Sequence, residues 1–143
     1  MNERLMDWLA TTDHTPARQA TILLVEYEER VRLALHSFLQ RRGYEIIGVG
    51  TVEEAEQCIT DRGNENIAVI VSDINLHPDS TGREGYKFFQ RWTAEYPDLP
   101  FILMSGDHTV WDLPAVRSGA VRVLVKPFSV YDLLAAVRSV LLE

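Results

Sequence analysis

The chain alternates between short, uninterrupted apolar runs and longer segments in which apolar residues recur at helical spacing. Apolar runs rich in aliphatic and β-branched residues are typical of strands that are buried on both faces of a parallel sheet. The runs are 21–26, 44–49, 67–73, 101–105 and 121–125. Their alternation with helical segments predicts an α/β fold in which helices cover both faces of a doubly wound, five-stranded parallel sheet.

Four of the longer segments are predicted helices, namely 28–42, 51–62, 86–96 and 129–142. Thr51 is a good N-cap for the second of these helices, and Glu54 three residues later completes a capping box. Ser129 is a candidate N-cap for the last helix. Gly43 and Gly63 stand where the first two helices are expected to end, and glycine is the residue that helix C-termini favour.

The pattern weakens between the fourth and fifth apolar runs, where Pro114 lies. Proline is tolerated in the first turn of a helix but not in its interior. We therefore expect a long loop from Gly106, followed by a short helix that Asp112 caps. That helix should end near Ser118, with Gly119 as its stop.

Residues 1–20 stand apart from this alternation and are predicted to be an N-terminal arm or linker before a domain at 21–143. Within the arm, Leu5, Met6, Trp8 and Leu9 could form one short amphipathic helix. Such a helix would dock on a partner or mediate a homodimer. A loosely ordered leader is an equal alternative.

The composition is that of one globular domain, with 46% hydrophobic and 24% charged residues. A net charge of −7, from 14 basic and 21 acidic side chains, argues against a nucleic-acid partner, because binding phosphates needs clustered cations. The single cysteine, Cys58, excludes an internal disulfide and is expected to be buried on a helix. No apolar run approaches the ~20 residues of a membrane span, and the N-terminus lacks a secretory signal, so we expect a cytoplasmic protein.

Four polar residues stand at the carboxyl ends of four of the apolar runs, namely Glu26, Asp73, Ser105 and Lys126. Right-handed crossovers bring these ends to one edge of a parallel sheet, where open α/β folds place their sites. An aspartate there can accept a phosphoryl group, and the transfer needs a cation and a metal such as Mg²⁺ near the phosphoryl oxygens. Taken singly, Asp73 could cap a helix and Lys126 could be a solvated lysine, but the joint placement favours a phosphoacceptor site.

The pieces ILLVEYEE, VIVSDINL, ILMSGD and VKPFS carry a resemblance that covers the chain from about Thr21 to Glu143. On these pieces the sequence resembles the receiver domain of bacterial two-component response regulators. The resemblance implies a CheY-like, flavodoxin-like sheet with strand order 2-1-3-4-5. It also implies a cis peptide bond between Lys126 and Pro127.

The same resemblance implies the roles of the site residues. Asp73 would accept the phosphoryl group from a histidine kinase. Ser105 would be the Ser/Thr whose hydroxyl hydrogen-bonds a phosphoryl oxygen, and Lys126 would be the lysine that pairs with another. Mg²⁺ would be held by Glu26, Asp73 and the backbone carbonyl of Asn75.

The sequence departs from the family pattern beside the metal position. Tyr27 occupies the position whose carboxylate usually contacts Mg²⁺, and a phenol is a poor replacement, so we expect weakened Mg²⁺ binding. Glu28 is an alternative ligand, although it more simply begins a helix. The loop after Asp73 is also longer than usual, with His77 in the position of the family's proline and Gly85 twelve residues past Asp73.

The longer loop could bring Asp79 or Glu84 near the metal, or it could alter partner docking, and plain loop tolerance is the simpler alternative. His77 has no metal-ligand spacing to another histidine or cysteine, so we assign it no metal. Val123 stands where the family has an aromatic residue whose ring rotation reports phosphorylation to the output face. Pro114 shortens the helix that belongs to that face. The signalling surface is therefore predicted to be remodelled.

Three functional hypotheses follow from these residues. The first is a stand-alone receiver in a phosphorelay, with a histidine kinase or phosphotransfer protein as donor and a downstream protein effector as partner. Such a receiver would not be an enzyme, and would at most catalyse its own phosphorylation and dephosphorylation. The second is a pseudo-receiver that binds partners without phosphorylation. The third, a phosphatase of the haloacid dehalogenase type, is disfavoured because Asn75 stands where a general acid is needed.

Overall fold

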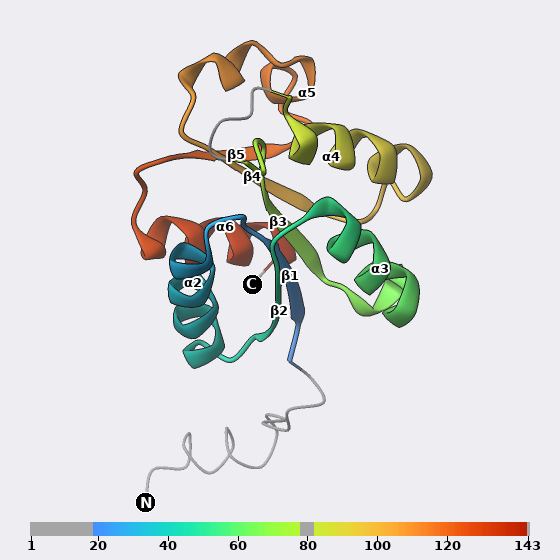
Figure 1. The fold of residues 1–143 in the computed structure, drawn as a ribbon, viewed down its shortest axis with the longest axis vertical. Helices are drawn as coiled ribbons and strands as arrows, with labels where there is room; N and C mark the ends of the chain where they lie inside the picture. The colour runs from blue at the N-terminus through green and yellow to red at the C-terminus, as the bar shows by residue number, and fades with distance from the viewer. Residues whose placement is uncertain (1–18, 78–81, 143) are drawn as a thin grey trace, which may run out of the picture.

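The structure of the protein is a computed structural model that describes residues 19–77 and 82–142. Five parallel strands form one sheet with the order β2-β1-β3-β4-β5 (Figure 1). The strands are β1 (Thr21–Val25), β2 (Glu45–Val49), β3 (Val69–Asp73), β4 (Phe101–Ser105) and β5 (Arg122–Val125). The doubly wound sheet and its order 2-1-3-4-5 are therefore confirmed.

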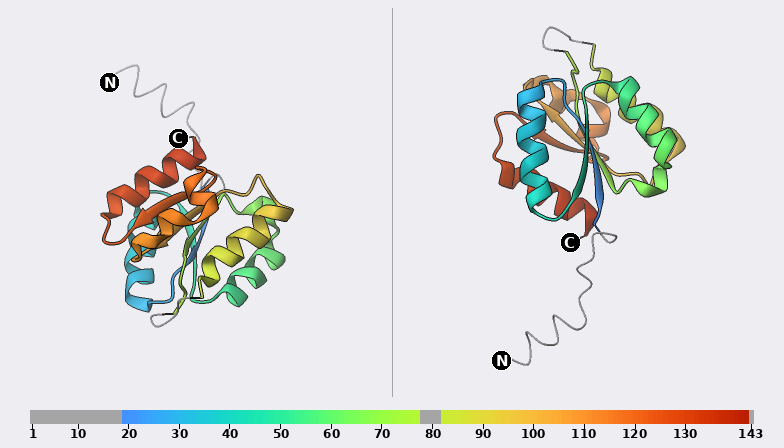
Figure 2. Two further views of the ribbon diagram at one scale, coloured as in Figure 1. Left: turned by 90° about the horizontal axis from the view of Figure 1, so that it is seen from above. Right: turned by 60° about the horizontal axis from the view of Figure 1, so that its bottom comes forward.

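Helices cover both faces of this sheet. The longer helices are α2 (Glu29–Arg41), α3 (Val52–Arg62), α4 (Glu84–Glu95) and α6 (Val130–Leu141), and the shorter ones are α5 (Pro114–Arg117), η2 (Asn64–Asn66) and η3 (His108–Asp112). Both views in Figure 2 show α2 and α6 on one side of the sheet and α3 and α4 on the other. Helix α5 packs on the α3 and α4 side, through Ala115 and Val116.

The sheet separates two hydrophobic cores. Alternate residues of each central strand point to opposite faces, so Leu23 lies in the core under α3 and α4 while Leu24 lies in the core under α2 and α6. Every residue of β1, β3 and β4 is buried. This double burial explains why the sequence shows continuous apolar runs there rather than an alternating pattern.

Most predicted boundaries agree with the structure to within two residues, and the capping chemistry accounts for two of them. The Thr51 side chain accepts a hydrogen bond from the backbone N–H of Glu54 at the start of α3. Ser129 and Asp132 form a reciprocal capping box at the start of α6. Strand β3 begins at Val69, two residues later than predicted, because η2 and a bend precede it.

The segment between β4 and β5 differs from the prediction of a long loop followed by a helix capped by Asp112. A 3₁₀ helix, η3, occupies most of the predicted loop, and its cap is Asp107, whose carboxylate accepts a hydrogen bond from the N–H of Thr109 at 2.9 Å. The residue before α5 is Leu113, which makes no side-chain cap. The prediction was wrong because Asp107, next to the strand end, starts helical structure earlier. Pro114 does occupy the first turn of α5, as expected.

Four further predictions concern the N-terminal arm, a membrane span, Cys58 and the peptide bond before Pro127. The amphipathic segment around Leu5 and Trp8 lies outside them, so the N-terminal arm and the domain boundary stay predictions. No helix among the residues described is long and apolar enough to cross a membrane. Cys58 is half-buried against the core under α3 and α4. The peptide bond between Lys126 and Pro127 is cis, as the resemblance implies.

Candidate functional site

The backbone register of the sheet brings the predicted site residues to one edge. Asp73 pairs with Met104, and Ser105 pairs with Val125, the residue before Lys126. Backbone hydrogen bonds continue just past the strand ends, from the N–H of Glu26 to the Val49 carbonyl and from the N–H of Lys126 to the Ser105 carbonyl. Glu26 and Lys126 are thereby held in line with the strands that precede them.

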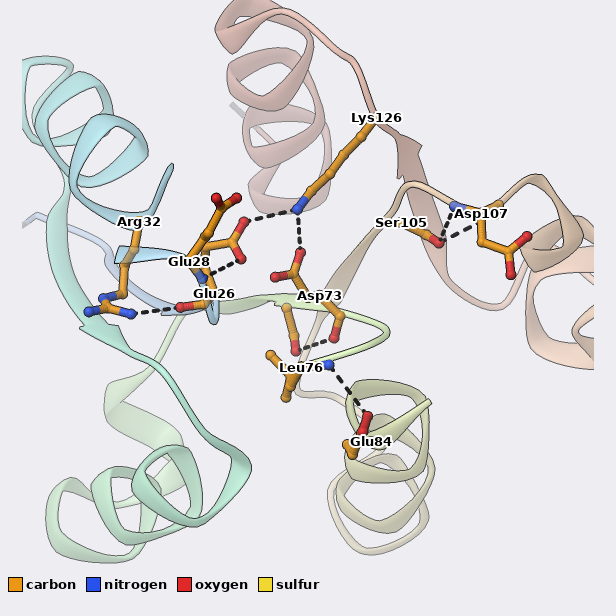
Figure 3. Close-up of polar contacts among 10 residues, drawn as sticks. Glu26, Glu28, Arg32, Asp73, Leu76, Glu84, Ser105, Asp107 and Lys126 are labelled. Carbon is orange, nitrogen blue, oxygen red and sulfur yellow. Dashed lines mark hydrogen bonds and ion pairs between the residues drawn. The ribbon is translucent and has the colours of Figure 1, made fainter. Parts of the chain in front are cut away.

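The Lys126 ammonium lies between two buried carboxylates (Figure 3). Its Nζ atom is 2.9 Å from Oε1 of Glu26 and 2.9 Å from Oδ1 of Asp73. Glu26 is 2% exposed and Asp73 is 4% exposed, whereas the Lys126 side chain is one-third exposed. Two carboxylates can be buried side by side only if a cation or a proton offsets their repulsion, and Lys126 supplies the cation.

The pKa values of the Asp73 and Glu26 carboxyls are shifted in opposite directions. Burial, and then the adjacent Glu26, raise the pKa of Asp73 to about 8, although Lys126 acts in the opposite direction. Burial also acts to raise the pKa of Glu26, but hydrogen bonds from Asp73 and Lys126 outweigh it and hold that pKa below its ordinary value. At neutral pH the pair therefore shares one proton, which resides mainly on Asp73.

One oxygen of Asp73 has capacity for a further partner. Oδ1 forms an ion pair with Lys126 Nζ at 2.9 Å, and no other described residue donates a hydrogen bond to this oxygen. A carboxylate oxygen has two lone pairs, so Oδ1 can accept one further contact beside this ion pair, such as a metal ion or an electrophile.

Ser105 lies at the end of β4 and is buried, but its hydroxyl is engaged elsewhere. The Oγ atom accepts a hydrogen bond from the N–H of Asp107 at 3.0 Å and lies 3.4 Å from the Asp107 carbonyl oxygen. Figure 3 shows Ser105 and Asp107 together, to one side of the carboxylate pair. The structure thus gathers Glu26, Asp73 and Lys126 but holds the Ser105 hydroxyl in the turn that follows its own strand.

The loop after β1 places the Tyr27 ring at the surface, beside His77. The Tyr27 side chain is 43% exposed, and its ring centroid lies 5.2 Å from that of His77. Glu28 contributes its backbone rather than its side chain, because its N–H donates to Oε2 of Glu26 at 3.2 Å. Arg32, in the first turn of α2, donates a side-chain hydrogen bond to the Glu26 carbonyl at 2.8 Å. This contact holds the loop after β1 in place. Sequence reasoning missed Arg32, because nothing local marks that contact.

Hydrogen bonds join the two described ends of the loop after β3. Asn75 accepts a hydrogen bond from the N–H of Arg83 through its side-chain oxygen, at 3.0 Å. Glu84 accepts a long one from the N–H of Leu76, at 3.4 Å. The alternative in which Glu84 approaches a metal stays a prediction, and Asp79 lies outside the described residues.

Glycine at position 85 is required by a close approach. A Cβ atom there would overlap the carbonyl oxygen of Asp73, and the N–H of Gly85 donates to the Ile74 carbonyl at 2.8 Å. The Ser72 hydroxyl donates to the same Asp73 carbonyl at 2.9 Å. The first turn of α4 is thus packed directly against the backbone of the predicted phosphoacceptor. The sequence marked Gly85 as a loop glycine, but the contact itself depends on tertiary packing.

The donor set at this edge fits Mg²⁺ in part. The carboxylates of Glu26 and Asp73 and the backbone carbonyl of Asn75 are oxygen donors of the kind that this ion prefers. Oδ1 of Asp73 pairs with Lys126 and accepts no hydrogen bond from another described residue, so it could also contact the ion. Tyr27 adds no carboxylate, and the described residues contain no cluster of three or more acidic, histidine or cysteine side chains placed to hold a metal.

Comparison with known proteins agrees with this architecture. The family model of the response regulator receiver domain matches residues 22–138. The chain is 33% identical over 116 residues to the response regulator protein FleR of Pseudomonas aeruginosa, a match that covers 80% of this chain and 23% of FleR. It is also 33% identical over 125 residues to the sensor kinase CckA of Brucella abortus, which covers 85% of this chain and 12% of CckA.

Solved structures show the same fold. The signal receiver domain of an HD domain-containing protein from Pseudomonas fluorescens superposes with a TM-score of 0.72 at 26% identity, covering 87% of this chain and 88% of that one. The receiver domain of NtrX from Brucella abortus superposes with a TM-score of 0.71 at 26% identity, covering 84% and 97% respectively. The chain spans about a quarter or less of the length of the curated relatives FleR and CckA.

Proposed function

The chain belongs to the response regulator receiver domain family of two-component systems, and from that premise we propose that it signals by accepting a phosphoryl group on Asp73. The observation that carries the proposal is the position of Lys126, whose Nζ forms an ion pair with Oδ1 of Asp73 at 2.9 Å. A cation beside the accepting carboxylate is what an incoming phosphoryl group needs. The receiver domain is a signalling fold, which favours this role over a phosphatase.

The proposed transfer is a displacement at phosphorus. An Asp73 oxygen attacks the phosphorus of a phosphohistidine on the donor protein, the new O–P bond forms, and the P–N bond breaks with its electron pair going to the imidazole nitrogen. Lys126 pairs with a phosphoryl oxygen and offsets its charge. Asp73 must first lose the proton that it shares with Glu26, so the attacking form is the more abundant one at higher pH.

Mg²⁺ is the proposed cofactor, held by Glu26, Asp73 and the Asn75 carbonyl. When it is bound, it neutralises negative charge on the transferring group. Because Tyr27 turns its ring toward His77 and adds no carboxylate, the affinity should be lower than that of a site with one more acid.

The proposed partners are a histidine kinase or phosphotransfer protein as donor and a downstream protein effector that reads the phosphorylated state. The net charge of −7 disfavours a nucleic-acid partner. Phosphorylation adds charge at one strand end and biases the domain between two conformations, and a partner binds one of them better.

The experiment is incubation with acetyl phosphate and Mg²⁺ followed by intact mass measurement. Wild type should gain the mass of one phosphoryl group, and Asp73→Asn should gain none. Asp98→Asn is the matched control, since it removes one exposed carboxylate from the turn before β4 and should be modified like wild type. A wild type that stays unmodified while another receiver is phosphorylated in the same tube would contradict the proposal.

That negative result would support the second candidate, a pseudo-receiver that binds partners without phosphorylation. Two observations favour it. The Ser105 hydroxyl is bound to the backbone of Asp107, and Tyr27 leaves the metal position without its usual carboxylate. In that case Lys126 would be the permanent counter-ion of the two buried carboxylates rather than a ligand for a phosphoryl oxygen.

A further inference from the structure

We infer that Tyr86 is a positioning residue that links the backbone of Asp73 to helix α5 and passes changes at the phosphoacceptor to that helix. The inference rests on the proposed function, in that phosphorylation is the event to be transmitted. It concerns three consecutive contacts, from Asp73 to Gly85, from Gly85 to its neighbour Tyr86, and from Tyr86 to Ala115 in α5.

The first contact fixes the start of α4 to the end of β3. Gly85 lies so close to Asp73 that even a methyl group at its Cα would overlap the Asp73 carbonyl oxygen. Its N–H is also bound to the carbonyl of Ile74, the next residue along. Packing without a gap transmits displacement instead of absorbing it, so the first turn of α4 must follow any shift of the Asp73 backbone.

The third contact runs from Tyr86, the residue after Gly85 in the same turn, to α5. Tyr86 is 6% exposed, and its hydroxyl oxygen accepts a hydrogen bond from the backbone N–H of Ala115 at 3.3 Å. Ala115 is the second residue of α5, and the first N–H groups of a helix have no partner within the helix. Since Leu113 before the helix makes no side-chain cap, the phenol of Tyr86 serves as the cap.

Helix α5 is short, and apart from the Tyr86 contact it is held by the packing of Ala115 and Val116 against the core. It is four residues long, and Pro114 at its start has no N–H to donate. Such a short helix has low local stability, so the partly buried hydrogen bond to Tyr86 helps to orient it. Val123 on β5 packs against the same core with an apolar side chain only, so it cannot make an equivalent polar contact with α5.

The test compares Tyr86→Phe with wild type by amide hydrogen exchange over residues 108–119. The matched control is Tyr131→Phe, which removes a hydroxyl from an exposed tyrosine on α6. In unmodified protein, Tyr86→Phe should speed exchange of the Ala115 amide about fivefold, which corresponds to the ~1 kcal/mol of one neutral hydrogen bond. The control should leave that amide unchanged.

Phosphorylation then tests the transmission itself. After acetyl phosphate and Mg²⁺, with the extent checked by intact mass, wild type should show altered exchange in α5. Tyr86→Phe should be phosphorylated to the same extent but show no such change. Equal responses of α5 in both proteins would overturn the inference. If wild type gains no phosphoryl mass, the proposed function fails, and the Ala115 amide in unmodified protein still decides whether Tyr86 holds α5.

A second perturbation needs no phosphorylation. Gly85→Ala must push the first turn of α4 away from Asp73, because the new methyl group overlaps the carbonyl oxygen. In wild type this change should speed exchange in α5, and in the Tyr86→Phe background it should add nothing to α5. Additive effects of the two substitutions on α5 would contradict the linkage.

Discussion

Replacing Asp73 by asparagine should stabilise the protein, and the gain should depend on pH. The pKa of Asp73 is raised from 3.8 to about 8 in the native state, chiefly by burial and by Glu26. Between these two pH values the native state therefore holds a proton that the unfolded state has released. Wild type loses stability as pH rises through this window, and the loss levels off above about pH 8. Asparagine is neutral throughout and avoids the loss.

The expected gain in stability follows from how far the pKa of Asp73 is raised. A carboxyl titrating alone with these pKa values would cost the native state roughly 4 kcal/mol at neutral pH, at ~1.36 kcal/mol for each pKa unit. The pKa of Glu26 is lowered and that of Lys126 is raised, so both recover part of this cost. We expect a net gain of ~1–2 kcal/mol for Asp73→Asn near pH 8 and almost none near pH 4.

The assay is urea unfolding of both proteins across this pH range without divalent ions, with Asp98→Asn as the control for losing one surface charge. Adding Mg²⁺ should shrink the difference, because the ion stabilises ionised Asp73 in wild type and has lost a ligand in the variant. A variant that is less stable than wild type near pH 8, or a difference that does not change with pH, would refute the reasoning.

The other predictions concern the cation, the metal and the loop glycine. Lys126→Met should lower stability by about 3 kcal/mol in urea unfolding at neutral pH, because the remaining negative charge of the buried carboxyl pair loses its counter-ion, and a loss near zero would contradict the ion-pair geometry. Tyr27→Asp should tighten Mg²⁺ binding about tenfold by titration calorimetry, since ligand charge sets affinity, whereas an unchanged affinity would place the metal away from this loop. Gly85→Ala should cost about 3 kcal/mol by overpacking, while Gly106→Ala, where a Cβ would meet nothing within 4 Å, should be nearly neutral. Equal costs at the two glycines would argue against the close approach to Asp73.

The sheet and its edge could be predicted because the signals for them are local. Continuous apolar runs mark strands that are buried on both faces, and parallel pairing then brings Glu26, Asp73 and Lys126 to one edge. The caps at Thr51 and Ser129 were also predictable, because a hydroxyl and an acid three residues apart form a hydrogen-bonded unit by themselves.

The remaining features depend on contacts that the sequence does not specify. The prediction placed a helix cap at Asp112, but Asp107 caps a helical segment that begins earlier. Both residues are suitable caps, and the sequence alone does not say which of them is used. The orientation of the Ser105 hydroxyl depends on the same turn. Arg32 and Gly85 act on backbone atoms of other segments, so their partners become visible only when the chain is folded.

The most direct test of the central claim is to locate the phosphoryl group. After incubation with acetyl phosphate and Mg²⁺, the protein is digested and the modified peptide is mapped by mass spectrometry, with and without hydroxylamine, which cleaves acyl phosphates. The account predicts a single hydroxylamine-labile phosphoryl group on the peptide that contains Asp73. A phosphoryl group that resists hydroxylamine, or that maps to any peptide without Asp73, would contradict it.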